Sequence, residues 1–257
     1  MNLYDQWIAL STLATKEIRR FLRIWSQTLL PPAITMTLYF VIFGTLIGRR
    51  IGEMDGYPYI QYVAPGLIMM AVLTNSYSNV VSSFFGNKFQ RCIEELLVSP
   101  TPNYIILAGF VAGGVARGLI VGLVVTLVSL FFTHMEVHNL AIVLVTVILT
   151  AVLFSIAGLV NGVFARNFDD VNIVPTFVLT PLTYLGGVFY SISALSDFWQ
   201  LVSKMNPILY MVNAFRYGFL GISDVSVSFA LGMIMVFIFL LGALALYLLE
   251  SGSRLRA

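Results

Sequence analysis

Residues 140–165 read LAIVLVTVILTAVLFSIAGLVNGVFA, a run of 26 positions without one charged side chain. A helix needs about 20 apolar residues to cross the hydrocarbon core of a bilayer, so this run predicts a membrane-spanning helix. Of all 257 residues, 59% are hydrophobic and only 10% are charged, against about 25% charged in an average soluble domain. So few charges cannot cover a soluble fold of this size, and the sequence therefore predicts an integral membrane protein.

Five further apolar segments of similar length precede and follow this run. Together, the six expected spans cover residues 29–48, 60–85, 104–133, 140–165, 171–190 and 225–249. Pro31 and Pro32 suit the first turn of the first span, and Pro175 and Pro181 predict a kink in the fifth. The expected fold is one all-α transmembrane domain over residues 1–257, with six transmembrane helices.

The lysines and arginines next to the spans predict the orientation, because cytoplasmic loops carry an excess of them. Nine lie on one side: Lys16, Arg19, Arg20, Arg23, Lys88, Arg91, Arg166, Arg254 and Arg256. Four lie on the other: Arg49, Arg50, Lys204 and Arg216. Both termini are therefore expected in the cytoplasm.

Residues 1–28 precede the first span and have the pattern of an amphipathic cytoplasmic helix. The residues that define this pattern are Trp7, Ile18, Phe21 and Trp25 on the apolar face and Arg20 and Arg23 on another face. A helix that is basic on one side and aromatic on the other typically lies in the membrane interface. The other interpretation is a cytoplasmic helix that docks on protein.

The largest cytoplasmic polar segment lies between the second and third spans, at residues 86–100, where the chain reads GNKFQRCIEELLVSP. Residues 88–98 are expected to form about three helical turns, which end at Ser99 because a residue before proline disfavours the helical region. Arg91 and Glu95 are four residues apart, which predicts an ion pair along the helix. In so apolar a chain, this segment is a place for a soluble partner to bind. The other interpretation is a solvated hairpin between two spans.

The outer segment at residues 191–224 is too apolar to lie free in water and too short to cross the membrane twice. Both limits fit a re-entrant or interfacial helical hairpin before the last span, broken at Asn206 and Pro207. A surface-lying amphipathic loop is the alternative.

Arg117 lies inside the third span, beside glycines at positions 109, 113, 114, 118 and 122 that allow helix backbones to approach closely. We expect this stripe to pack on another part of the same chain rather than on a second copy. A charge inside a span indicates a functional role by default. However, this span is about 43 Å long at 1.5 Å per residue, longer than the hydrocarbon core of about 30 Å, so the alternative places Arg117 near the cytoplasmic interface.

Motifs for chemical catalysis are missing from the sequence. A P-loop needs Gly-Lys-Ser/Thr, but the three lysines follow Thr15, Asn87 and Ser203. The spans hold no central Asp, Glu or His of the kind that ion-coupled transporters use. His134 and His138 frame Met-Glu-Val, which is not the His-Glu-x-x-His arrangement of zinc proteases. We therefore expect no enzyme activity, metal or cofactor in this chain.

A net charge of +2 without a clustered basic face argues against nucleic-acid binding. The class that remains is a transport subunit whose energy comes from a separate cytoplasmic ATPase, which would hold the ATP and Mg²⁺. The alternatives are an ion-gradient-driven secondary transporter and, with less support from the residues, an intramembrane enzyme or a membrane scaffold.

Two segments resemble the ABC-2-type permeases, the membrane subunits of a class of ATP-binding cassette transporters. Residues 91–100 resemble the family's first cytoplasmic loop, where a short charged helix ends in Leu-Leu-x-Ser/Thr-Pro. The family's signature around the fifth span and the outer hairpin is matched by Gly187, Phe189, Asn206, Pro207, Tyr210 and Arg216. The six-span layout and the amphipathic start match as well, although Cys92 and Ile93 stand where the family often has Gly and Thr.

The resemblance implies a homodimer, or occasionally a heterodimer, of permeases bound to two copies of a separate ATPase at a bacterial inner membrane. It implies that the loop helix rests in a groove of that ATPase, with the contacts made by Arg91, Glu94, Glu95, Leu96 and Leu97. The N-terminal helix would lie against membrane lipids and support the same contact. Transport in this family is usually outward, of drugs, lipids or glycans.

Overall fold

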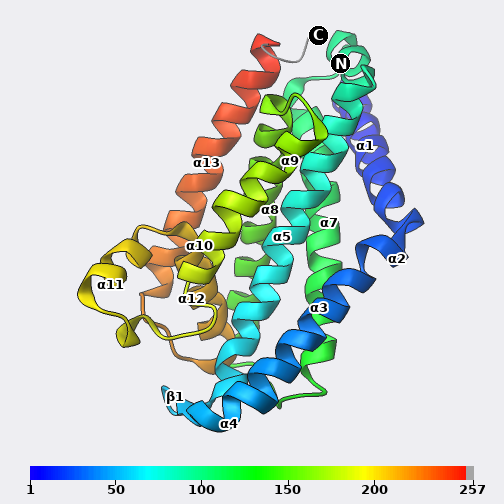
Figure 1. Cartoon of the computed structure of the whole chain (residues 1–257). Helices are drawn as coiled ribbons and strands as arrows, with labels where there is room; N and C mark the ends of the chain where they lie inside the picture. The colour runs from blue at the N-terminus through cyan, green and yellow to red at the C-terminus, as the bar shows by residue number, and fades with distance from the viewer. Residues whose placement is uncertain (253–257) are drawn as a thin grey trace.

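The apolar run at residues 140–165 forms helix α8 (Leu140–Phe164). The Asn139 side chain caps this helix by accepting a hydrogen bond from the Ile142 amide at 3.2 Å, which pairs one of the amides that a helix start leaves free. Three more long helices run beside α8 in the computed structural model, which describes residues 1–252 (Figure 1). They are α5 (Tyr59–Phe89), α7 (Asn103–Ser129) and α13 (Val227–Ser251). Arg254 and Arg256, which support the predicted orientation, lie outside the described residues.

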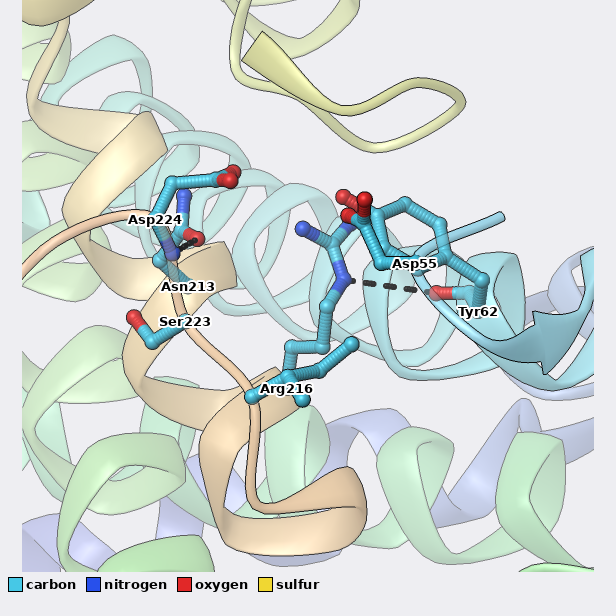
Figure 2. Close-up of a pocket in the computed structure, with 7 residues that line it drawn as sticks. Asp55, Tyr62, Asn213, Arg216, Ser223 and Asp224 are labelled. Atoms are coloured by element: carbon cyan, nitrogen blue, oxygen red, sulfur yellow. Dashed lines mark hydrogen bonds between the residues drawn. The ribbon is translucent and has the colours of Figure 1, made fainter. Parts of the chain in front are cut away.

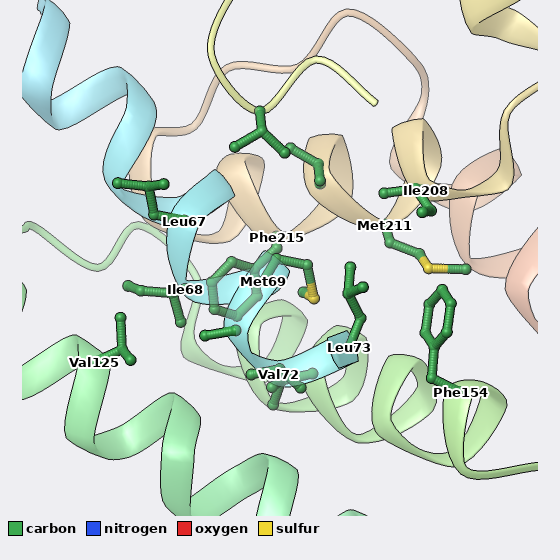
Figure 3. Packing of buried hydrophobic residues seen from close by; sticks show 14 of the residues in the cluster. Leu67, Ile68, Met69, Val72, Leu73, Val125, Phe154, Ile208, Met211 and Phe215 are labelled. Atoms are coloured by element: carbon green, nitrogen blue, oxygen red, sulfur yellow. The ribbon is translucent and has the colours of Figure 1, made fainter. Parts of the chain in front are cut away.

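Helix α5 lies in the middle of the bundle, and α7, α8 and α12 (Pro207–Leu220) pack around it. Figure 3 shows part of the apolar core between these helices. The side chains labelled there are Leu67, Ile68, Met69, Val72, Leu73, Val125, Phe154, Ile208, Met211 and Phe215. Glycine brings two of the backbones close: a Cβ at Gly158 of α8 would lie 2.5 Å from the carbonyl oxygen of Tyr77 on α5. Such close approach is how helices pair within a membrane.

Four helical stretches of the described chain are long and apolar enough to cross a membrane: Trp25–Ile51, Asn103–Ser129, Leu140–Phe164 and Val227–Ser251. The second and fifth expected spans are not among them. Helix α5 is long enough, but the buried polar residues Asn75, Ser76, Asn79 and Ser83 lie in its second half. The fifth expected span is short and irregular. The helical membrane architecture is confirmed, and the number of six spans stays a prediction.

The first span is a series of helical pieces that ends in a hairpin turn. Its pieces are α2 (Trp25–Thr28), α3 (Leu30–Val41), the π-helix Ile42–Ile47 and α4 (Gly48–Ile51). The two-stranded hairpin of β1 (Glu53–Met54) and β2 (Tyr57–Pro58) then leads into α5. Asp55 and Gly56 form its turn with φ of 50° and 82°, the positive values that a tight hairpin of type I′ requires.

The irregularity predicted at the prolines of the fifth segment is a π-helical turn. Helix α9 (Phe168–Val174) continues through Pro175–Leu179 into α10 (Thr180–Leu185). Proline removes an amide from the helical ladder, and kinks are found at such π-helical turns. The helical segment from α9 to α10, which we call the α9–α10 rod, lies beside α5 and can bend at this π-helical turn (Figure 1).

The outer segment contains the 3₁₀ turn Ile192–Ala194 and two helices, α11 (Asp197–Lys204) and α12. The break between the helices falls at Asn206, as the sequence predicts. The Asn206 side chain caps α12 by accepting from the Ile208 amide at 3.0 Å. Helix α12 is buried against α5, α8 and α13, whereas α11 lies at the periphery (Figure 1). Entry of this segment into the membrane stays a prediction.

The N-terminal helix α1 (Leu3–Arg23) docks lengthwise on α7. The face that it buries carries Leu13, Glu17 and Phe21. Of the expected apolar residues, Phe21 lies on this buried face, whereas Trp7 and Trp25 are 66% and 56% exposed, and the position of the helix in the membrane interface stays a prediction. The helix breaks at Ile24, so Trp25 belongs to α2 and does not continue the helical phase of α1.

Candidate functional site

The loop between α5 and α7 forms helix α6 (Cys92–Val98), which is shorter than the sequence suggests because α5 continues to Phe89. Gln90 and Arg91 make the turn, and Arg91 has a left-handed φ of 61°. A left-handed residue other than glycine is uncommon, and here it redirects the chain from α5 into α6. Ser99 is extended and ends the helix before Pro100, as predicted.

One side of α6 packs on the bundle and the other faces outward. Ile93 is fully buried and joins a core cluster with Phe84 and Ile106, and Leu96 and Leu97 pack against that cluster while partly buried. The outward side carries Arg91, Glu95 and Val98, which we call the loop face. The ion pair expected between Arg91 and Glu95 does not form, since Arg91 lies in the turn before α6 rather than within the helix. The salt bridge found among residues 1–252 joins Arg20 and Glu17.

Two contacts tie the end of α5 to its neighbours just before the loop. The Lys88 ammonium donates to the carbonyl oxygens of Val163 and Ala165 at 2.6 and 2.8 Å, at the end of α8. A cation there pairs carbonyls that a helix end leaves free and complements the helix dipole. The Phe89 ring lies 5.2 Å from that of Phe168 at the start of α9. If the loop moves, these two contacts therefore transmit the movement directly to α8 and α9.

Arg117 and Arg20 have asparagine partners on α5. The Arg117 Nη2 donates to Asn75 Oδ1 at 3.1 Å. The Arg20 Nη2 donates to the side-chain and backbone oxygens of Asn79 at 2.8 and 3.0 Å. The Arg20 Nε also pairs with the buried Glu17 carboxylate at 3.2 Å. The sequence pointed to Arg20 and Arg117 but not to Asn75 and Asn79, whose only signal is their spacing of four residues.

Arg216 of the family signature is buried at the outer end of the bundle, with 1% of its surface exposed. Its Nη2 donates to the carbonyl oxygen of Gly187 at 2.6 Å, and its Nε donates to that of Tyr62 at 3.3 Å (Figure 2). The guanidinium carbon lies 3.9 Å from the centre of the Tyr62 ring. The pKa of Arg216 is lowered, because burial disfavours the charged guanidinium. Electrostatic interactions with Tyr62, Asp224 and Asp55 offset part of this effect.

A cavity of about 170 Å³ adjoins Arg216, and the carboxylates of Asp55 and Asp224 line it as well (Figure 2). Gly187 has a φ of 70°, a left-handed value that favours glycine. Arg216 thus links this tight turn after α10 to the first turns of α5, and it braces the outer segment.

The other signature residues also fasten the outer segment. Phe189 stacks on Phe43 of the first span at 4.7 Å, and its carbonyl accepts a hydrogen bond from the Tyr59 hydroxyl at 3.0 Å. Asn206 donates to the carbonyl oxygen of Leu182 on α10, and Pro207 begins α12. The Tyr210 hydroxyl donates to the carbonyl oxygen of Lys204 at 2.6 Å. These residues are braces of the fold rather than an exposed binding surface.

The one face of α5 that the bundle leaves open carries hydroxyl groups. Thr74 and Ser82 are exposed, and Ser78 between them is partly exposed. Thr74 and Ser82 donate to the carbonyl oxygens four residues earlier, at 2.8 and 2.7 Å. Such internal bonds let hydroxyls sit in an apolar environment. We call these three residues the hydroxyl stripe.

Comparison with known proteins is consistent with these features. Residues 8–220 match the family described as the ABC-2 type transporter. This chain belongs to the ABC-2 type transporter family. It is similar to the "Inner membrane transport permease YadH" of Escherichia coli (strain K12), with 60% identity over 257 residues and full coverage of both chains. It is also similar to "Nodulation protein J" of Rhizobium leguminosarum bv. viciae, with 22% identity over 202 residues, or 78% of each chain.

This ABC-2 type protein is thus a membrane permease subunit of an ABC transporter. Within residues 1–252, no three His, Cys, Asp or Glu side chains are grouped so that they could hold a metal ion. His134 and His138 instead line an outer cavity of about 300 Å³ together with Glu136. The His138 ring packs edge-on against Tyr217 at 5.5 Å.

Proposed function

We propose that this permease subunit belongs to an exporter, works as a homodimer, and is driven by a separate ATPase that binds the loop face and holds the ATP and Mg²⁺. The loop face is the observation that carries the proposal. Val98 is 87% exposed at the end of α6, on the side that also carries Arg91 and Glu95, two charges that form no ion pair within the described part of the chain. Exposed apolar surface with a charged rim is typical of a protein contact.

The contacts around the loop supply a route for the force. Ile93 anchors α6 in the bundle, so a push on the loop face moves α6 together with the end of α5. Lys88 and Phe89 pass that movement to the ends of α8 and α9. Because α9 leads to the π-helical turn, the α9–α10 rod can bend in response, and the outer ends of the dimer separate.

The hydroxyl stripe supports a second copy of the chain. Contacts between helices in a membrane are enriched in small residues such as Ser and Thr, whose hydroxyls can also bond across to the neighbouring helix. Thr74, Ser78 and Ser82 form a row on the open face of α5, and a homodimer that places two α5 helices across a shared path would bring the two rows together. The substrate path would then run between the two copies.

The remaining features support a location in the bacterial inner membrane. The name of the similar Escherichia coli protein includes the inner membrane, and the apolar helices suit a multi-pass protein there. With both termini in the cytoplasm, α6 and the exposed tip of α1 lie on the side where ATP is available. The exposed Trp7 and Trp25 of α1 and α2 would contact membrane lipids.

A substitution in the loop face tests the ATPase contact. Val98→Asp buries a carboxylate without a partner if a protein covers this position, which costs several kcal/mol. We expect at least about tenfold less ATPase to co-purify with a tagged Val98→Asp permease from native membranes. The amount of P-loop protein per permease is measured by quantitative mass spectrometry. Leu97 is less suitable, because it also packs on the permease itself.

Val137→Asp is the matched control. Val137 is also an exposed valine, but it lies in the connection between α7 and α8 at the other end of the bundle. Val137→Asp should leave the amount of co-purified ATPase unchanged. Equal recovery with Val98→Asp and Val137→Asp, at equal permease levels, would rule out the loop face as the docking site.

A further inference from the structure

Five polar side chains from three helices meet near the junction of α1 and α2. They are Glu17 and Arg20 of α1, Asn75 and Asn79 of α5, and Arg117 of α7, and we call them the arginine cluster. The two asparagines that accept from the arginines are one helical turn apart on the same face of α5. The two guanidinium groups are therefore held side by side.

The arginine cluster has an excess of positive charge. Arg20 and Arg117 bring two cations, and Glu17 brings the single carboxylate. That carboxylate accepts from the Nε of Arg20 at 3.2 Å. Arginine remains protonated in proteins, so the cluster carries a net charge of +1 that its own residues do not balance.

The cluster also has more hydrogen-bond donors than acceptors. Asn79 is fully buried, yet its Nδ2 has no acceptor, and the buried Nε of Arg117 has none either. Buried donors are almost always paired in folded proteins, and an unpaired one points to a missing partner. Unpaired donors beside a surplus cation call for an anion.

The location of the cluster selects the kind of anion. Arg20 lies five residues before Trp25, where one candidate membrane-spanning stretch begins, and Arg117 lies within another, Asn103–Ser129, so the cluster lies in a part of the bundle that lipid can surround. Arg20 keeps 32% of its side chain exposed, and the nearby Leu22 and Ile24 are 42% and 40% exposed. A cation that is reachable from the membrane and flanked by apolar side chains suits a lipid headgroup.

We propose that Arg20 and Arg117 bind the phosphate of an anionic membrane lipid. Guanidinium groups match phosphate oxygens in geometry and charge. The phosphate accepts from the partly exposed guanidinium groups of Arg20 and Arg117, and the lipid chains lie along the exposed apolar residues at the α1–α2 junction. The bound lipid joins α1 to α7 beside the contact of Arg20 with Asn79 of α5. This site does not depend on the ATPase contact proposed above.

The test measures lipid binding by the purified full-length permease in a neutral detergent. Native mass spectrometry gives the affinity for phosphatidylglycerol, with phosphatidylcholine and inorganic phosphate as comparisons. Arg20→Gln and Arg117→Gln should each bind phosphatidylglycerol about tenfold more weakly, the effect of losing one charge-assisted hydrogen bond. Arg23→Gln removes an exposed arginine of the same helix and should leave the affinity unchanged.

Glu17→Gln separates binding from folding. This variant removes the carboxylate that competes for Arg20, so it should bind phosphatidylglycerol about threefold more tightly, even if α1 docks less firmly. A purely structural cluster would show weaker binding instead. Arg20→Lys keeps the charge and serves where Arg20→Gln fails to fold.

Three results would overturn the proposal. One is equal phosphatidylglycerol affinity in the Arg20, Arg117 and Arg23 variants. Another is equal affinity of the unmodified protein for phosphatidylcholine, which carries no net charge. The third is thermal stabilisation by inorganic phosphate that matches the effect of phosphatidylglycerol, since this would assign the site to a free anion rather than a lipid.

Discussion

Gly113 shows how a single residue controls the docking of α1. A Cβ at this position would lie 2.5 Å from the Cβ of Glu17, a distance that real side chains do not reach. Gly113→Ala should therefore push α1 away from α7 and lower the free energy of unfolding by about 1–3 kcal/mol, the usual cost of overpacking. Thermal unfolding of the purified permease measures this effect.

Gly232→Ala is the control for that substitution. Gly232 lies in α13, and a Cβ there would meet no atom within 4 Å. Alanine is a better helix former than glycine by about 1 kcal/mol, so this variant should be equally or more stable than the parent. Destabilisation of both variants to the same extent would mean that the backbone, and not the contact with α1, explains the glycine at 113.

The sequence predicted where backbones come close but not which residues meet. The glycine stripe on α7 indicated packing within the chain, and the structure places Gly113 on α1 and Gly118 on Ser76 of α5. Arg117 was singled out as a charge within a span, but its partner Asn75 lies 42 residues away. Such pairs depend on the rotation of each helix about its axis, which hydrophobic periodicity fixes only to within a broad face.

Asn206 joins two elements of the outer segment. Its side-chain oxygen caps α12 through the Ile208 amide, and its nitrogen donates to the carbonyl oxygen of Leu182 on α10. Asn206→Ala should cost about 1 kcal/mol for the cap alone and should also release α11 and α12 from α10. We expect faster hydrogen exchange in residues 191–206 of the variant, measured by mass spectrometry.

Asn139→Ala provides the comparison. Asn139 caps α8 in the same way, through the Ile142 amide, but its side chain forms no hydrogen bond to another segment within residues 1–252. Asn139→Ala should lower the thermal stability of the permease without faster hydrogen exchange in residues 191–206. If both variants changed exchange there equally, Asn206 would act only as a cap and not as a link to α10.

The elements that the sequence predicts well are those with long apolar runs, such as α8. The short α6 was harder, because α5 extends to Phe89 and leaves fewer residues for the loop helix. The family resemblance assigned Leu96 and Leu97 to the ATPase, yet both pack partly on the permease, and Val98 is the more exposed residue. An apolar side chain in a loop has two possible neighbours, and sequence alone does not distinguish them.

At the scale of the whole molecule, the number of spans decides on which side α6 lies. If six segments cross, α5 and the α9–α10 rod both span, and α6 shares the cytoplasm with both termini. If only the four most apolar stretches crossed, α5 would not span, and strict alternation would put α6 on the side opposite the N-terminus, whereas in the structure Tyr104 and Asn87 at the α6 end contact Gln6 and Lys16 of α1. The polar residues of α5 reduce its hydropathy, but Asn75, Ser76, Asn79 and Ser83 are buried among other helices, and the exposed Thr74 and Ser82 hydrogen-bond within the helix, so six spans are physically reasonable.

Cys92 is a natural reporter of this choice, because it is the only cysteine of the chain and lies partly exposed at the start of α6. With six spans, a membrane-impermeant maleimide should label Cys92 in inside-out vesicles and leave it unlabelled in intact spheroplasts. Val137→Cys in a Cys92→Ser background should show the opposite pattern, since residue 137 lies in the connection at the other end of α7. Labelling of Cys92 from outside would contradict the predicted cytoplasmic position of α6, and it would place the loop face where no ATP-hydrolysing partner could reach it. The sidedness of this one thiol therefore tests both the fold and the mode of energy supply.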